Sequence, residues 1–280
     1  LREASRGVSY DYANYSAHLF LAESYAAYRD PRTINLRYET PFFSELLVSQ
    51  LLAPVGAGNL SQYISQQEYT RLFEGDKQGL FSSTWYDSGD TWVEEFSQFG
   101  TVKDFMYSVD LFYRSQDGWR PNNDFTQVEV SGRFKQQLTP HDSLFFQASF
   151  YNSRSGDILQ YYDQGQANPG LRIEEDQDPN LYLGYHHEWA PGMHTLFLGA
   201  WLTDTLTATN PLAPVFTVNR SAADVITNVV LSPANPNSAR FRDCYESEFK
   251  VFSAELQQIW QKGRHTVVAG ARAQIGDVDT

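Results

Sequence analysis

Apolar and polar residues alternate one by one along most of the stretch from Phe105 to Phe150. The first row occupies the odd positions from Phe105 to Tyr113, and the positions between them are polar except for Met106 and Phe112. After a polar tip, the alternation resumes in two further segments. A period of two predicts β-strands whose two faces lie in different environments.

The alternation recurs often enough along the chain to predict nine strands. A strand of a soluble protein usually has about 5–6 residues, whereas a strand that crosses a bilayer needs roughly 9–11. Most of the predicted strands have the longer length, and their polar faces carry charges that a packed core would reject. The strands are expected at 79–87, 91–99, 102–114, 124–138, 143–153, 180–189, 194–204, 247–260 and 265–276.

The connections between these strands differ at the two ends of the sheet. Short turns at one end and long loops at the other are typical of bacterial outer-membrane barrels, where the short turns face the periplasm. This pattern places the N-terminal segment in the periplasm. Tight turns are expected around Gly100 and at 139–142, 190–193 and 261–264. Long polar loops are expected at 115–123, 154–179 and 205–246, with 87–90 as the short exception.

Nine strands would leave an open sheet edge, which lipid does not tolerate. The sequence therefore predicts a mainly β fold, an incomplete antiparallel transmembrane meander barrel preceded by a short α-helical segment. We expect a longer protein that extends this chain at both ends and carries an export signal upstream.

The first part of the chain has helical periodicity. Residues 14–28 place small and apolar side chains on one helical face, with Asn14 or Ser16 available as the N-cap. A second helix is expected to begin at Thr40-Pro41, because proline is favoured at the first helical position. The predicted division of the chain is terminal helices of a periplasmic domain at 1–55, a connector at 56–78 and the first part of the barrel at 79–280.

Composition excludes several classes of protein. The net charge of −13 argues against nucleic-acid binding, because no basic stripe offsets it. Aromatic residues make up 15% of the chain although the mean hydropathy is −0.46, which suits a barrel with an apolar outer band and a polar lumen. No apolar run approaches about 18 residues, so a transmembrane helix is not expected. The single Cys244 excludes an internal disulfide.

The polar positions of the predicted strands form the one constellation that we single out. Mixed charges with aromatic rings could line a path for a polar solute or a sugar chain, by hydrogen bonds and ring stacking. The same side chains could instead pair across strands and fill the barrel wall. The predicted lumen-facing residues are Asp110, Arg114, Glu129, Arg133, Lys135, Gln147, Tyr151, His186, Glu188, Trp201, Glu255 and Arg272.

Other chemical signals are weak. His186 and His187 are adjacent on one strand, so their rings point to opposite faces and cannot chelate one metal. The acidic run 174–178 lacks the glycine and the spacing of a calcium-binding EF-hand and is expected to be a solvated loop. Phosphate-loop, zinc-protease and serine-hydrolase motifs are absent from the sequence. We therefore predict no catalytic residue, no metal site and no cofactor, and a protein that is not an enzyme.

Three segments resemble a group of bacterial envelope proteins in which periplasmic tetratricopeptide repeats lead directly into an outer-membrane β-barrel, often described as TonB-dependent-receptor-like. Within the first segment, His18, Leu21, Ala22 and Tyr25 have the spacing of the first helix of such a repeat, with His and Ala where Trp and Gly are usual. Polysaccharide-secretion porins share this plan. The segments are Tyr15–Tyr25, Ser44–Pro54 and Asp117–Asp124.

The resemblance implies a Gram-negative outer-membrane location and a role in transport or secretion. The implied partners are outer-membrane lipid, a transported solute or polysaccharide, and periplasmic proteins bound by the helices. Neither a plug domain nor a TonB box is visible in the sequence, which counts against energised uptake.

Four functions remain open on the sequence alone. The leading one is movement of a solute or polymer across the outer membrane by binding and passage, and TonB-dependent-receptor-type uptake is a variant of it. A structural or adhesive envelope anchor would use the long loops to bind partners and would have a lumen filled by side chains. A soluble all-β module, such as a propeller or a sandwich, would have to bury the apolar rows in a second layer, for which the sequence offers no complementary domain.

Overall fold

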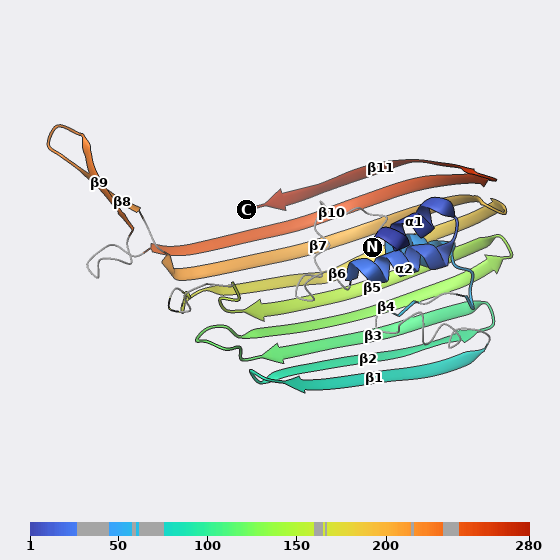
Figure 1. Cartoon of the computed structure of the whole chain (residues 1–280), viewed down its shortest axis with the longest axis horizontal. Coiled ribbons are helices and arrows are strands. Elements are labelled where there is room, and N and C mark those ends of the chain that lie inside the picture. Colours follow the sequence, from blue (N-terminus) through green and yellow to red (C-terminus); the bar gives the residue numbers. More distant parts are fainter. Residues whose placement is uncertain are drawn as a thin grey trace.

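The computed structural model describes residues 1–26, 45–57, 60–61, 76–159, 165, 167–213, 216–231 and 241–280. Three helices precede a set of strands (Figure 1). The helices are α1 (Arg2–Tyr10), α2 (Tyr15–Ala26) and α3 (Glu45–Leu52). The first strands are β1 (Lys77–Asp87), β2 (Thr91–Val102), β3 (Phe105–Gln116), β4 (Phe125–Thr139), β5 (Asp142–Ser155) and β6 (Arg172–Ala190). The others are β7 (Met193–Ala213), β8 (Phe216–Arg220), β9 (Ile226–Leu231), β10 (Phe241–Lys262) and β11 (His265–Asp279).

Nine of the strands form one antiparallel meander in the order β1-β2-β3-β4-β5-β6-β7-β10-β11. The remaining two, β8 and β9, form a separate hairpin that projects from the end of the sheet where the long connections lie (Figure 1). Within the described part of the chain the sheet is not closed, and β1 and β11 are its two edges. The nine-strand antiparallel meander predicted from the alternation is confirmed, and the observed sheet is an open, curved wall.

The strands on the C-terminal side are longer than predicted. The strands β6, β7 and β10 have 19, 21 and 22 residues, and they take up much of what we expected to be the loops 154–179 and 205–246. The hairpin β8–β9 was also expected to be loop. The added parts are polar on both faces, as in the run Glu174-Glu175-Asp176, so they lack the apolar row that marks a strand in the sequence.

Two of the three helices were anticipated. The amide Oδ1 of Asn14 accepts hydrogen bonds from the backbone N–H of Ser16 (3.0 Å) and of Ala17 (3.2 Å), so Asn14 caps α2 as predicted. The helix α1 was not predicted. The expected start of the second helix at Thr40-Pro41 lies outside the described residues, whereas its later part is α3.

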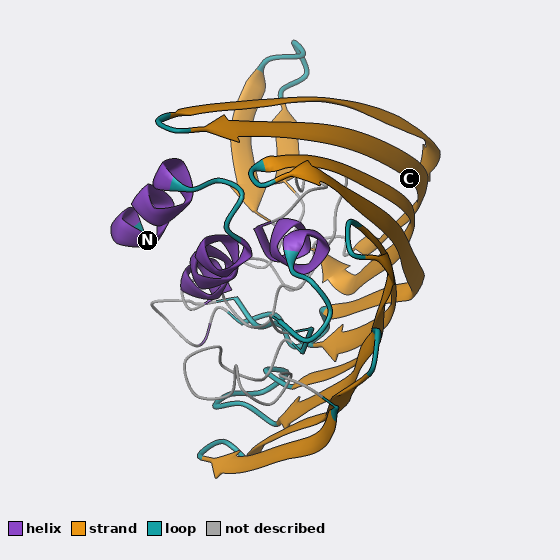
Figure 2. Cartoon of the chain, turned by 90° about the vertical axis from the view of Figure 1, so that its right-hand side faces the viewer, coloured by secondary structure: helices purple, strands orange, loops and turns teal. Residues whose placement is uncertain are grey.

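The helices lie against the concave side of the sheet (Figure 2). The core forms where α3 meets the sheet, with Leu51 of α3 at its centre. Gly184 of β6 makes room for this contact, because a Cβ atom at that position would lie 2.4 Å from Leu51 Cδ2. The other core residues of α3 and the strands are Leu47, Val48, Leu52, Phe99, Met106, Phe145, Tyr182, Leu196, Leu198, Ala200, Leu202, Phe249, Val251 and Ile259.

The convex face of the sheet is apolar and exposed. Large side chains there alternate in sequence with the buried residues of the concave face, as the period of two requires. Among the described residues, no helix is long and apolar enough to span a membrane. Exposed side chains of the convex face include Val109, Leu144, Phe146, Phe150, Leu183, Phe197, Trp201, Phe252, Leu256 and Trp260.

Candidate functional site

The predicted polar row lies on the concave face, with one exception. Trp201 is on the convex face and 41% exposed, because its neighbours Ala200 and Leu202 point toward the helix layer. We expected the apolar row of β7 to face outward, and this expectation was wrong because α3 supplies an apolar partner inside. The buried members are Asp110, Glu129, Arg133, Lys135, Gln147, Tyr151 and His186, and Arg114, Glu188, Glu255 and Arg272 share their face with less burial.

Asp110 is the centre of a buried hydrogen-bond network. Its Oδ1 accepts from the hydroxyls of Ser97 (2.6 Å), Ser108 (2.9 Å) and Ser61 (2.8 Å). Its Oδ2 accepts from Arg133 Nη1 at 2.7 Å, in an ion pair whose two side chains are both fully buried. Because Ser61 follows α3 in sequence, the network ties this segment to β2, β3 and β4.

Lys135 is the second polar anchor of the helix layer. Its ammonium donates to the carbonyl oxygens of Gln50, Leu51 (2.9 Å) and Ala53, at the C-terminal end of α3. A helix end exposes carbonyl groups that have no partner within the helix and that carry partial negative charge. Lys135, which is 1% exposed, therefore satisfies these carbonyls from the sheet.

Two buried histidines lie on the same face near the short turns. His186 Nε2 and His194 Nδ1 are 3.0 Å apart, with one ring donating to the other. His187 points to the opposite side, as predicted, and its Nδ1 lies 2.7 Å from Asp142 Oδ1. The described residues contain no group of three or more His, Cys, Asp or Glu side chains placed to hold a metal ion.

The remaining members of the row extend the polar face toward both edges. Gln147 accepts from Arg133 Nε at 3.2 Å, and the Arg114 guanidinium lies 5.5 Å from the centre of the Phe125 ring. Glu255 and Arg272 are direct register partners on β10 and β11. The acidic run 174–178 does not lie in a loop, because it belongs to β6, where Asp176 bonds Asn152 of β5.

A third buried group joins the helices to each other. His18 of α2 is fully buried, with Nδ1 against the carboxylate of Glu45 of α3 and Nε2 2.7 Å from the carbonyl oxygen of Tyr12. A carbonyl only accepts hydrogen bonds, so Nε2 carries a proton. Burial raises the pKa of the Tyr12 phenol, which accepts a hydrogen bond of 3.5 Å from Gln257 of β10.

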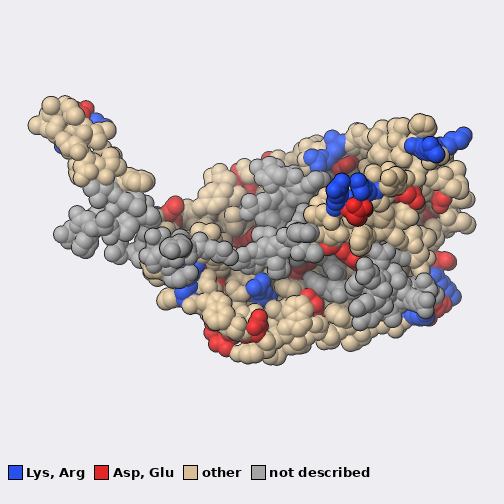
Figure 3. All heavy atoms as spheres, viewed as in Figure 1, with Lys and Arg blue, Asp and Glu red and all other residues tan. Residues whose placement is uncertain are grey.

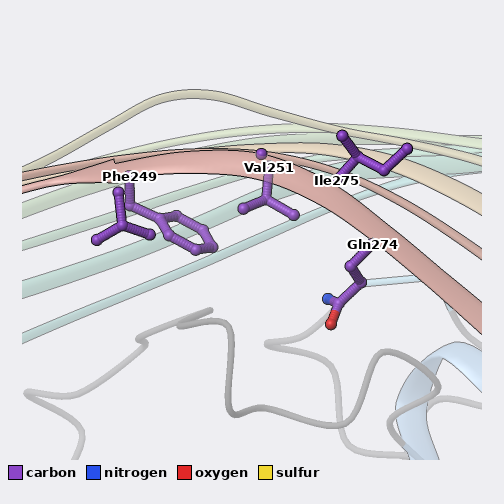
Figure 4. A pocket seen from close by; sticks show the side chains of 6 residues that line it. Phe249, Val251, Gln274 and Ile275 are labelled. Atoms are coloured by element: carbon purple, nitrogen blue, oxygen red, sulfur yellow. The ribbon is translucent and has the colours of Figure 1, made fainter.

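Two hollows flank the helix layer. An apolar groove of about 390 Å³ continues the core along β10 and β11, and its lining includes Phe249 and Val251 of β10 and Ile275 of β11 (Figure 4). A polar pocket of about 450 Å³ lies between the α1–α2 linker and the turns, with Asp11, Glu188 and His194 among its lining residues. On the side of the helices, Lys and Arg side chains are seen in small groups among Asp and Glu (Figure 3).

The anchors on the helix side were missed by the sequence analysis. No periodic pattern marks Ser61, His18 or the carbonyls of α3, because each acts through contacts with particular residues outside its own element. His194 directly follows the predicted turn at 190–193 and was not singled out, yet it is buried beside His186. Its place, directly opposite Glu188 across the β6–β7 turn, could have been derived from the strand alternation.

The sequence matches no protein-family model and no curated protein. The fold itself is that of a mainly β protein with a nine-strand antiparallel meander and three N-terminal helices.

Proposed function

We propose that this chain forms part of the wall of an outer-membrane β-barrel that moves a polar solute or polymer by binding and passage. The observation that carries the proposal is the reversed polarity of the sheet. Arg133, Lys135 and Asp110 are buried on the concave face, whereas Phe150 and Leu183 are exposed on the convex face. A protein surrounded by water gains free energy by burying such apolar rows, whereas a protein surrounded by lipid gains by exposing them.

The concave row supplies what passage by binding requires. It offers carboxylates, cations, amides and phenols on one continuous face, so that a polar ligand can exchange hydrogen bonds with water for hydrogen bonds with the wall. We therefore propose passage by binding, without covalent chemistry on the ligand.

The helix layer favours a gated path. The helix α3 and Ser61 occupy the concave face and are anchored there by Lys135 and Asp110. On this proposal the segment takes the position of a plug, although no plug domain is visible in the sequence. The short turns close to α1 and α2 would face the periplasm, where the helices could meet periplasmic partners.

A second candidate function is a partner-binding envelope anchor, and the hairpin β8–β9 favours it. This hairpin projects from the end of the sheet with the long connections, and its exposed side chains include Phe216, Val218 and Val229. Exposed apolar clusters of this kind are common at protein–protein contacts. An anchor of this type would keep its concave face permanently filled.

Fractionation of the native protein, followed by a gel run with and without boiling, tests the membrane proposal. We expect the protein in the outer-membrane fraction and a change of mobility on heating, because barrels stay folded in unheated detergent. A soluble protein whose mobility does not change would overturn the proposal. Conductance across a planar lipid bilayer then separates the two candidates, because a transporter with its plug released conducts ions and a filled anchor does not.

A further inference from the structure

We infer that Arg133 and Lys135 form a site for an anionic group of the passing ligand, and that the C-terminal end of α3 occupies this site in the structure. The inference rests on the proposed function for the route by which a ligand arrives. It adds the chemical class of the ligand, and it adds that the ligand displaces the end of α3 when it binds.

The first argument is the charge balance around Lys135. The ammonium is fully withdrawn from solvent and is bonded to three carbonyl oxygens at the end of α3. No carboxylate among the described residues lies within ion-pair distance of it. A buried cation is costly unless negative charge faces it, and a helix C-terminus supplies only about half an elementary charge. The end of α3 therefore stands where a full anion would be bound more strongly.

The second argument is an unused donor on the neighbouring residue of the same face. Arg133 gives Nη1 to Asp110 and Nε to Gln147, but its Nη2 has no hydrogen-bond partner among the described residues, although the side chain is fully buried. Residues two apart on a strand share a face and lie about 7 Å from each other. An oxyanion between Arg133 and Lys135 would satisfy both donors.

These donors select a class of ligand. Guanidinium and ammonium groups together recognise carboxylate and phosphate oxygens, whereas a neutral sugar offers neither the charge nor the acceptor strength. The ion pair with Asp110 neutralises the charge of Arg133, so Lys135 provides the net charge of the site. An acidic sugar chain or a phosphorylated solute would thus compete with the end of α3 and release it.

Hydrogen–deuterium exchange of the purified protein in detergent tests this competition. We expect sodium phosphate, and separately a uronic-acid trisaccharide, to accelerate amide exchange in Glu45–Leu52 by about threefold or more, because the helix opens more often when its anchor is occupied. Sodium chloride at equal ionic strength and a neutral trisaccharide serve as controls. Equal exchange in all four solutions would overturn the inference.

A pair of variants tests whether the anion accelerates exchange in α3 by binding at Lys135. In Lys135→Met the helix should exchange fast in every solution, and the anion-dependent increase should be lost. Lys103→Met removes an exposed lysine of the β2–β3 turn and should leave the increase unchanged. If Lys135→Met does not fold, the comparison of salts on the unaltered protein still decides. If the unaltered protein conducts ions but shows no anion response, this site alone is refuted, whereas an anion response in a non-conducting, soluble protein refutes the transport proposal alone.

Discussion

At the scale of single residues, the stability of the fold depends on a few charged side chains that are buried away from solvent. Asp110 receives three hydroxyl donors and one guanidinium, and Lys135 donates to three carbonyls. Buried charges of this kind are costly unless they are paired, and removing one partner leaves the other uncompensated. The polar anchors are therefore the positions at which a conservative change has the largest effect.

Asp110→Asn should destabilise the fold by about 3–5 kcal/mol, because it leaves the buried Arg133 without its counter-charge. The measurement is the urea midpoint of the transition seen on unboiled gels. Asp104→Asn makes the same change at an exposed position of the β2–β3 turn and should shift the midpoint little. Equal midpoints for the two variants would contradict the role given to Asp110.

At the scale of elements, the contact between α3 and the sheet decides whether the concave face is covered. It combines apolar packing around Leu51 with the polar anchors on either side. The joint between α2 and α3 includes the buried His18 beside Glu45, and the Ser49 hydroxyl of α3 donates to the carbonyl oxygen of Tyr15 of α2 at 2.8 Å. Changes in these contacts should loosen the helices while the strand ladder, which is held by its own hydrogen bonds, stays intact.

Gly184→Ala should displace α3, since the new methyl group would lie 2.4 Å from Leu51 Cδ2. Overpacking of this kind costs about 1–3 kcal/mol. Gly199→Ala on β7 is the matched control, because its nearest neighbours would be 3.8 Å away. Exchange of the α3 amides should accelerate in the first variant only, and a uniform response of both would refute the proposed close contact.

His18→Leu should weaken the protection of α2 and α3 together. The substitution leaves the Glu45 carboxylate and the Tyr12 carbonyl without their shared partner, which costs about 1–3 kcal/mol. His141→Leu, in the exposed β4–β5 turn, provides the comparison. If exchange in both helices were unchanged in His18→Leu, the joint would have to lie elsewhere.

What could be predicted of the fold and of the concave polar row depends on what fixes the position of each residue. Positions that follow from strand alternation could be predicted, whereas positions fixed by one distant contact could not. The faces of β3, β4 and β5 followed from alternation alone, including the exceptions Met106 and Phe112, which pack inward. The face on which Trp201 lies did not follow from alternation. The apolar row of β7 packs against α3, and the alternation does not encode the position of that helix. The pairing of Lys135 with the end of α3 is likewise invisible in sequence.

At the scale of the whole molecule, the sheet has one polar and one apolar side, and its two edges are unpaired in the described part of the chain. Both features are explained if the sheet is, as proposed, part of a closed barrel in lipid. Lipid would then cover the apolar face, and further strands would pair with the two edges. The sequence predicted the order of the strands because each main-sheet strand pairs with its neighbour along the chain, with only the small β8–β9 hairpin inserted.

Reconstitution into brominated lipid should reveal the apolar side. The chain has six tryptophans, so variants that retain only Trp201 or only Trp119 can be compared. Trp201, in the middle of the convex face, should be quenched strongly, whereas Trp119, in the β3–β4 loop, should be quenched weakly. Equal quenching of the two would show that the convex face does not contact lipid.

The distance in sequence between Lys135 and the end of α3 has a consequence for the order of assembly. Leu51 is synthesised first, yet the side chain that caps its carbonyl comes 84 residues later. Neighbouring strands can zip together locally, which is fast, whereas long-range contacts must wait for the loops between them to close. We therefore expect the helical segment to dock late, after the strands that supply its partners have paired.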